Sequence, residues 1–128
     1  MGTRRCPCGG GLLFAECCGP LHDGTRTAAT AEQLMRSRYS AFARGDAAYL
    51  LATWHPQTRP ATLAMDPQVR WTGLDVLATI GGSPLEREGT VEFRAHHVVG
   101  GTTGAQHERS RFVREHGHWL YLDGVSLS

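Results

Sequence analysis

The sequence predicts an α+β protein in which helices pack on one face of a curved, four-stranded antiparallel sheet, with a small cysteine-rich segment in front. Three observations support this prediction. Apolar residues recur at helical spacing between about residues 30 and 54, and after residue 68 they alternate with a period of two. All four cysteines lie within the first 18 residues. Helices that precede the strands, rather than alternating with them, are typical of an α+β fold.

The cysteine-rich segment, residues 1–25, needs a cross-link to hold one shape. Its stretch "CPCGGGLLFAECCGP" is rich in glycine and has no apolar stripe long enough to form a core. The spacing is Cys-x-Cys, then eight residues, then Cys-Cys. Four thiolates can surround a Zn²⁺ ion tetrahedrally with bonds of about 2.3 Å. We therefore predict a zinc site whose ligands are Cys6, Cys8, Cys17 and Cys18.

Other interpretations of this segment stay open. Two disulfides would have to close very short loops and would need an oxidising compartment, and unlinked cysteines are more often scattered. An iron–sulfur cluster would use the same ligands, but the spacing matches no ferredoxin-like pattern. His22 is an alternative fourth ligand. We also expect residues 12–14 to start a helical turn that carries the second cysteine pair, with Leu12, Leu13 and Phe14 facing the main domain.

The first long helix begins at a capping box. Thr30 is the expected N-cap, and Gln33 follows three residues later. The apolar stripe of this helix is Met35, Tyr39 and Phe42. Gly45 is expected to end it.

A second, shorter helix is expected from Ala47 to about Trp54. Asp46 can cap it, and the pair His55-Pro56 ends it because a residue before proline is pushed out of helical conformation. Residues 58–67 contain two prolines and are expected to form an irregular loop.

Four strands follow, joined by glycine-containing turns. Their expected ranges are Val69–Ile80, Gly89–Val99, Ala105–Arg114 and His118–Asp123. The apolar face of the first strand is expected to hold Leu74, Val76, Ala78 and Ile80, and that of the second Val91, Phe93 and Ala95. Residues 81–84 are expected to turn the chain, and residues 100–104 to form a hairpin loop.

Composition excludes several classes of protein. The net charge is +1, with 13 basic and 12 acidic residues and no run of like charge, so a nucleic-acid surface is not indicated. No apolar run approaches the ~20 residues that span a bilayer. We therefore expect a cytoplasmic protein that is not bound to a membrane. Motifs of common catalytic sites, such as a nucleophile elbow, a P-loop or HExxH, are missing from the sequence.

Two stretches carry a resemblance to known families. "CPCGGGLLFAECCG" resembles the SEC-C motif, a zinc-binding module known from the preprotein translocase motor SecA, although the lysines usual between its cysteine pairs are missing here. "EQLMRSRYSAFARGDAAYLLATWHP" and "ERSRFVREHGHWLYLDG" resemble the YchJ-like family of uncharacterised bacterial proteins. The resemblance implies a zinc knuckle in residues 1–25 and a cystatin-like, nuclear-transport-factor-2-like cone in residues 26–128.

Cone folds often enclose a cavity between sheet and helices, so polar residues on the expected core faces are pocket candidates. These are Arg38, Tyr39, Trp54, Trp71, Glu92, Arg94, Glu108, Arg109 and Arg111. His55 is the natural acid or base, with Glu108 to orient it. The alternative is that the charged residues form ion pairs on a solvated strand face and that the aromatic residues are core.

Two functions remain as hypotheses. The first is a binding module with a structural zinc knuckle that presents a surface to another protein; the four thiolates would leave no open position for catalysis. The second is a small-molecule-binding protein or small enzyme that uses the cone cavity, with His55 as acid or base. A homodimer is compatible with either.

Overall fold

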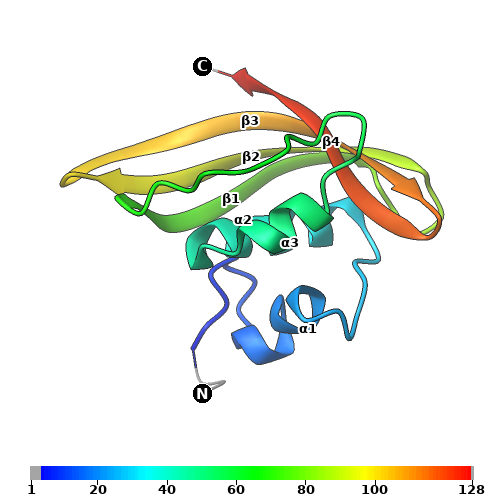
Figure 1. The fold of residues 1–128 in the computed structure, drawn as a ribbon, viewed down its shortest axis with the longest axis horizontal. Coiled ribbons are helices and arrows are strands. Elements are labelled where there is room, and N and C mark those ends of the chain that lie inside the picture. The colour runs from blue at the N-terminus through cyan, green and yellow to red at the C-terminus, as the bar shows by residue number, and fades with distance from the viewer. Residues whose placement is uncertain (1–3, 128) are drawn as a thin grey trace.

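The computed structural model describes residues 4–127 and contains one antiparallel sheet with helices on one side (Figure 1). The elements are a 3₁₀ helix η1 (Phe14–Glu16), helices α1 (Gly19–His22), α2 (Ala31–Arg44) and α3 (Ala47–Ala52), and strands β1 (Val69–Gly81), β2 (Glu88–Val99), β3 (Thr102–Glu115) and β4 (His118–Leu127). The sheet order is β1-β2-β3-β4. The predicted α+β class and the four-stranded antiparallel meander are therefore confirmed. None of the helices in these residues is long and apolar enough to cross a membrane.

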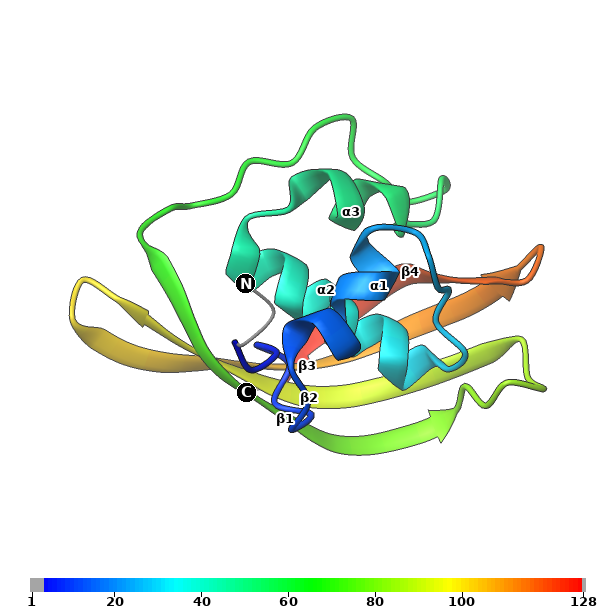
Figure 2. The same ribbon diagram turned by 90° about the horizontal axis from the view of Figure 1, so that it is seen from below.

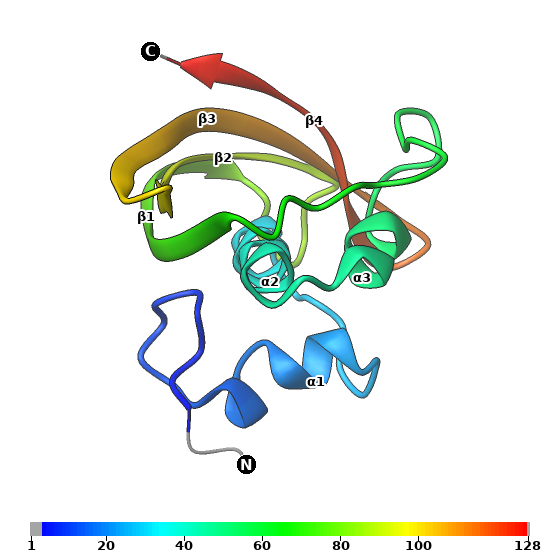
Figure 3. The same ribbon diagram turned by 60° about the vertical axis from the view of Figure 1, so that its left-hand side comes forward.

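The molecule has three layers, which are clearest along the axis of α2 (Figure 3). The curved sheet forms one layer, α2 and α3 form the middle one, and the cysteine-rich segment with η1 and α1 packs on the far side of α2. Seen from below, this segment crosses α2, while residues 53–68 run around the outside from α3 to β1 (Figure 2). Helix α2 therefore has the sheet on one side and the cysteine-rich segment on the other.

Helix α2 begins and ends as its sequence predicts. The Thr30 hydroxyl accepts a hydrogen bond from the backbone N–H of Gln33 at 3.0 Å, and the Gln33 side chain accepts one from the Ala29 N–H at 2.8 Å. Gly45 ends the helix in the left-handed region, with φ of 73°. These bonds satisfy backbone donors that a helix start otherwise leaves unpaired.

Replacing Thr30 by alanine should lower the free energy of unfolding by about 1 kcal/mol, because the N–H of Gln33 then loses its acceptor. Urea unfolding of the two proteins measures the difference. Thr30→Ser is the matched control, since it keeps the hydroxyl and should stay close to the wild type. Equal stability of the alanine and serine variants would contradict the cap.

Helix α3 ends earlier than expected. Asp46 caps it by accepting a hydrogen bond from the Tyr49 N–H at 3.0 Å, but the helix stops at Ala52. The chain then pairs with β4: the Tyr121 N–H donates to the Thr53 carbonyl, and the His55 N–H donates to the Tyr121 carbonyl, both at 2.8 Å. This pairing competes with a further helical turn, so Trp54 lies beside the sheet.

Strand β1 corrects the predicted apolar face. Leu74 and Val76 pack against the core, as expected. The pairing with β2 then shifts register between Val76 and Ala78, and Ile80 is 71% exposed. A bulge inserts one extra residue and so reverses which side chains face inward. The prediction that Ala78 and Ile80 continue the core face was therefore wrong, whereas Val91, Phe93 and Ala95 of β2 do face the core.

The β2–β3 hairpin is tighter than predicted. Val99 pairs with Thr102, so the turn consists of Gly100 and Gly101 alone, with φ of 58° and 82°. Positive φ at both central residues is the requirement of the type I′ turn that joins strands with two residues. The expected loop of residues 100–104 is thus mostly strand.

The main core lies between α2 and the inner face of the sheet. Its buried members are Ala31, Leu34, Met35, Tyr39, Val91, Ala95, Phe112 and Trp119. The start of α2 is fixed by two hydrogen bonds, from the Ala31 N–H to the Gly82 carbonyl at 3.0 Å and from the Trp119 indole to the Ala29 carbonyl at 3.1 Å. The helix that carries the candidate site residues is therefore tied to the sheet.

Candidate metal centre and cavity

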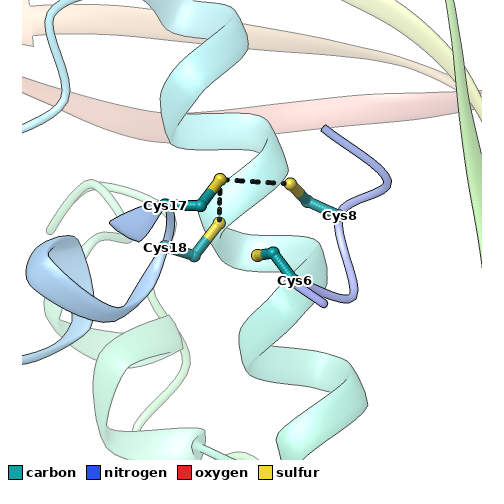
Figure 4. A group of neighbouring side chains, drawn as sticks. All are labelled: Cys6, Cys8, Cys17 and Cys18. Atoms are coloured by element: carbon teal, nitrogen blue, oxygen red, sulfur yellow. Dashed lines mark hydrogen bonds between the residues drawn. The ribbon is translucent and has the colours of Figure 1, made fainter. Parts of the chain in front are cut away.

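The four cysteine sulfurs converge beside α2 (Figure 4). All four lie within 4.8 Å of one another, and none forms a disulfide. The Sγ atoms of Cys8 and Cys17 are 3.6 Å apart, and those of Cys17 and Cys18 are 4.0 Å apart. A tetrahedron of metal–sulfur bonds of about 2.3 Å has edges of about 3.8 Å. The cluster therefore has the size of a four-thiolate metal site, and the disulfide alternative does not fit.

Two backbone turns bring the sulfurs together. The first is a small hairpin in which the Cys6 N–H donates to the Leu12 carbonyl at 2.9 Å, with Gly9 and Gly11 at φ of 76° and 89°. A side chain at Gly10 would place its Cβ 3.3 Å from the Cys8 sulfur. The glycines thus let the backbone curl tightly around the sulfurs, which explains why this stretch is glycine-rich.

The second turn is η1 followed by α1. Its two cysteines lie at the junction, where Cys17 ends η1 and Cys18 precedes α1. A Cβ at Gly19 would lie 2.7 Å from the Phe14 carbonyl oxygen, so the two short helices can be this close only because residue 19 is glycine. The predicted helical turn before the second cysteine pair is therefore present, two residues later than expected.

Burial and charge favour a metal in this cluster. The side chains of Cys6, Cys8 and Cys18 are buried. Hydrogen bonds from the thiols of Cys18 and Cys8 lower the pKa of Cys6, whereas burial raises the pKa of Cys17 to about 12 and the bond to Cys6 raises that of Cys18. Four adjacent thiols cannot all ionise unless a cation balances them. A divalent metal would supply that balance, so the donor set fits one.

The cysteine segment is bound to α2 by polar contacts. The Cys6 sulfur lies 3.4 Å from the Ser40 hydroxyl, and the Arg36 guanidinium donates to the Cys8 carbonyl at 2.8 Å. The Arg44 guanidinium lies 3.9 Å from the centre of the Phe14 ring. The prediction that the leucines also face the main domain was wrong for Leu12, which is 51% exposed on the returning arm of the hairpin, opposite Cys6.

His22 is engaged elsewhere. Its Nε2 lies 2.7 Å from the Ser37 carbonyl of α2, and its ring packs against those of Phe14 and Tyr49. The ring therefore joins α1 to α2 and does not point into the cluster of sulfurs. The alternative in which His22 replaces one thiolate does not fit this arrangement.

A cavity of about 220 Å³ lies between α2 and the sheet. It is lined by Met35, Arg38, Tyr39, Phe42, Trp54, Trp71, Phe93, Ala95, Gln106, Glu108, Ser110, Phe112 and Tyr121. Five of the predicted pocket residues are in this lining: Arg38, Tyr39, Trp54, Trp71 and Glu108. Their role in ligand binding stays a prediction.

The other predicted pocket residues lie on the opposite face of the sheet. Successive residues of a strand face opposite sides, and Phe93 and Phe112 take the inner side. Glu92 therefore faces outward, where its carboxylate lies 2.7 Å from His107 and 3.6 Å from Arg109. Arg111 pairs with Asp123 at 2.7 Å, and Arg94 likewise lies outside the cavity lining. The prediction that these residues converge in a pocket was wrong, and the ion-pair alternative holds for Glu92, Arg109 and Arg111.

His55 does not meet Glu108. Its Nε2 lies 2.9 Å from the Glu115 carboxylate, and its Nδ1 accepts a hydrogen bond from the Gln57 N–H at 3.0 Å. His55 is not part of the cavity lining. Helix α3 ends early and the following residues pair with β4. The imidazole ring of His55 therefore lies beside Glu115, at the end of β3. The predicted acid–base pair is therefore absent from the described chain.

Several lining residues were missed by the sequence reasoning, although a signal for them exists. Ser110 and Gln106 of β3 line the cavity but were not predicted, although they lie two residues to either side of the predicted Glu108 on the same strand face as Phe112. Their polarity hides the alternation, because an inner face is normally recognised by its apolar residues.

Comparisons with known proteins agree with this arrangement. Residues 30–124 match a family model described as YchJ, middle NTF2-like domain. A UPF0225 protein of Streptomyces coelicolor is 56% identical over 127 residues, covering 99% of each chain, and one of Chromobacterium violaceum is 52% identical over 124 residues, covering 94% of this chain and 91% of that protein.

Two solved structures are similar over nearly the whole chain. The solution structure of a SEC-C motif containing protein from Rhodopseudomonas palustris has a TM-score of 0.84 at 36% identity, covering 96% of this chain and 98% of the other. The crystal structure of a SEC-C motif containing protein from Psychrobacter arcticus has a TM-score of 0.79 at 30% identity, covering 99% and 85%. The shared fold thus includes the cysteine segment as well as the sheet.

Proposed function

The chain belongs to the UPF0225 family of YchJ-like SEC-C motif proteins, and from this premise we propose that it is a binding protein whose cysteine segment is a structural zinc knuckle. The observation that carries the proposal is the convergence of four sulfurs within 4.8 Å of one another. Zn²⁺ favours tetrahedral thiolate sites, and four protein ligands leave no position for a reacting water. The role that fits such a site is structural.

The zinc ion would link two backbone turns, each of which supplies two of the cysteines. Cys6 and Cys8 belong to the hairpin, and Cys17 and Cys18 to the junction of the two short helices. Among residues 4–127, the small apolar cluster around them consists of the cysteines and Phe14, which are too few to fold alone. Bound metal would therefore supply most of the energy that orders the knuckle, and the polar contacts to α2 would orient it.

Elemental mass spectrometry of tag-free protein, purified without added metal, tests the proposal. We expect one zinc ion per chain. His22→Gln is the matched control, because His22 lies next to the cluster but is bound to α2, so this variant should keep its zinc. Iron in place of zinc, a chain without metal, or loss of zinc in the His22 variant would each contradict the proposed site.

The knuckle would also offer a surface to another protein. Leu12 is exposed on the returning arm of the hairpin, near the exposed Arg4 and Arg5 of the other arm. An exposed leucine beside arginines is a suitable contact for an apolar, acidic segment of a partner.

A photo-crosslinking amino acid at position 12 should give a discrete protein adduct in living cells. The same amino acid at position 85 is the control, because Leu85 is 90% exposed in the β1–β2 turn, far along the chain from the knuckle. The adduct at position 12 should disappear when Cys8 is replaced by serine, which removes the knuckle's metal. Identical adducts from both positions would contradict a specific surface.

A further inference from the structure

The cavity behind α2 contains a cation without an anionic partner. Arg38 is buried, and its Nη1 donates to the Leu50 carbonyl at 2.8 Å and to the Thr53 hydroxyl at 2.7 Å. Neither acceptor carries a charge, and within residues 4–127 this guanidinium forms no salt bridge. Buried charges are normally paired. The site therefore has the charge of an anion-binding position.

One of the aromatic side chains next to Arg38 has a hydrogen-bond donor without an acceptor. The guanidinium lies over the rings of Trp54 and Tyr121, at 5.2 Å and 4.5 Å from their centres. These contacts hold the cation in place at the cavity wall. The indole Nε1 of Trp54 is buried and has no hydrogen-bond partner in the described part of the chain. Buried N–H donors normally have a hydrogen-bond acceptor, and a bound ligand could supply the one that this indole lacks.

Glu108 is the carboxyl group of the cavity, and it does not pair with Arg38. It is half-buried, and burial alone raises its pKa. Within residues 4–127 its carboxylate forms no salt bridge with Arg38. Glu108 is more easily protonated than an ordinary glutamate, and when it is ionised it disfavours a second negative charge on a ligand.

The remaining walls are mainly aromatic. The aromatic residues of the lining are Tyr39, Phe42, Trp54, Trp71, Phe93, Phe112 and Tyr121. With a volume of about 220 Å³ the cavity is smaller than the ~300–1,000 Å³ of sites for drug-sized ligands. Aromatic rings favour stacked or edge-on contacts with another ring, so a flat, small ligand fits these walls.

We propose that this cavity binds a small aromatic monocarboxylate, whose carboxylate pairs with Arg38 and whose ring lies among the aromatic side chains. The planar guanidinium matches the two oxygens of a carboxylate, and one cation balances one negative charge. Glu108 selects against dianions. This binding site is separate from the cysteine cluster and does not depend on the role proposed for the zinc knuckle.

Titration of the zinc-containing full chain with 4-fluorobenzoate, followed by ¹⁹F NMR, tests the proposal. The matched ligand is 4-fluorobenzamide, which has the same shape without the charge. We expect the carboxylate to bind at least about tenfold more tightly, since pairing with a buried charge contributes more than about 1.4 kcal/mol. Equal affinity of the two ligands, or no binding of either, would overturn the proposal.

Two variants place the ligand in the cavity. Ala95→Leu fills space at a lining position without changing any charge and should abolish binding of 4-fluorobenzoate. Glu108→Gln should raise the affinity for the dianion terephthalate, which the wild type should reject, by a larger factor than it raises the affinity for 4-fluorobenzoate. Unchanged binding in the Ala95 variant would put the ligand elsewhere, and unchanged rejection of terephthalate would refute the role of Glu108. Circular dichroism of each variant confirms that it is folded.

Discussion

Replacing Cys8 by serine should release the proposed zinc ion and lower the free energy of unfolding by about 4 kcal/mol, which is within the range of large effects caused by the loss of a structural metal. Cys8 is completely buried, and its sulfur lies 3.6 Å from that of Cys17. A serine hydroxyl is a poor zinc ligand. Without the metal, the knuckle has too small an apolar cluster to stay folded.

The effect should extend beyond the knuckle. Ser37 and Ser40 of α2 are completely buried beneath it, and they contact His22 and Cys6. Loss of the knuckle would expose this face of the helix to water. The destabilisation should therefore appear in the melting of the whole domain, as a decrease of roughly 15 °C in its midpoint.

Differential scanning calorimetry with and without a chelator measures this change. The chelator should lower the midpoint of the wild type to that of the Cys8→Ser variant and should leave the variant itself unchanged. Acidification should act in the same direction, because protons compete with a bound metal for the thiolates. A wild type that melts at the same temperature with and without chelator would show that no metal holds the knuckle.

Replacing Gly89 by alanine should cost about 2–3 kcal/mol, although it adds a single methyl group. Gly89 lies near the start of β2, and a Cβ at this position would lie 2.5 Å from the Cα of Gly82. The atom that the new methyl group would meet belongs to the backbone, so it cannot move away as the end of a flexible side chain could. Gly82 in turn touches Ala31, and its carbonyl accepts the Ala31 N–H at the start of α2. The added methyl group would therefore push the helix away from the sheet.

Gly73→Ala is the matched control. Gly73 also lies in a strand and has an ordinary negative φ, but a Cβ there would meet only a His96 side-chain atom, at 3.8 Å. This variant should stay within about 1 kcal/mol of the wild type. Chemical denaturation of both variants gives the comparison. If the two glycines tolerate alanine equally well, the close approach of the β1–β2 turn to α2 is not a constraint.

The sequence predicts the elements well where local signals are strong. Thr30, Asp46 and Gly45 mark helix ends through hydrogen bonds and backbone conformations that involve only near neighbours, and all three act as expected. The cysteine spacing likewise predicts the cluster, because four ligands in two short turns can meet around one point. These features depend on chemistry within a few residues of the chain.

Local signals fail where strand pairing intervenes. The bulge of β1 reverses the face of Ile80, and pairing with Tyr121 of β4 ends α3 before Trp54. His55 turns to Glu115 for the same reason. A one-residue change of register moves every later side chain to the other face, and no pattern within the strand itself indicates where that change occurs.

What the sequence determined by itself is therefore the α+β class, the helix boundaries set by caps, and the four cysteines that can hold a metal. Only the tertiary structure decided which polar residues share the cavity. Arg38 lies inside because α3 and β4 pack around it. Glu92 and Arg111 lie outside because β2 and β3 turn Phe93 and Phe112 inward. The physical reason is that the packing of whole helices and strands decides whether a charged side chain is buried or exposed. That packing depends on contacts between residues that are distant in the sequence.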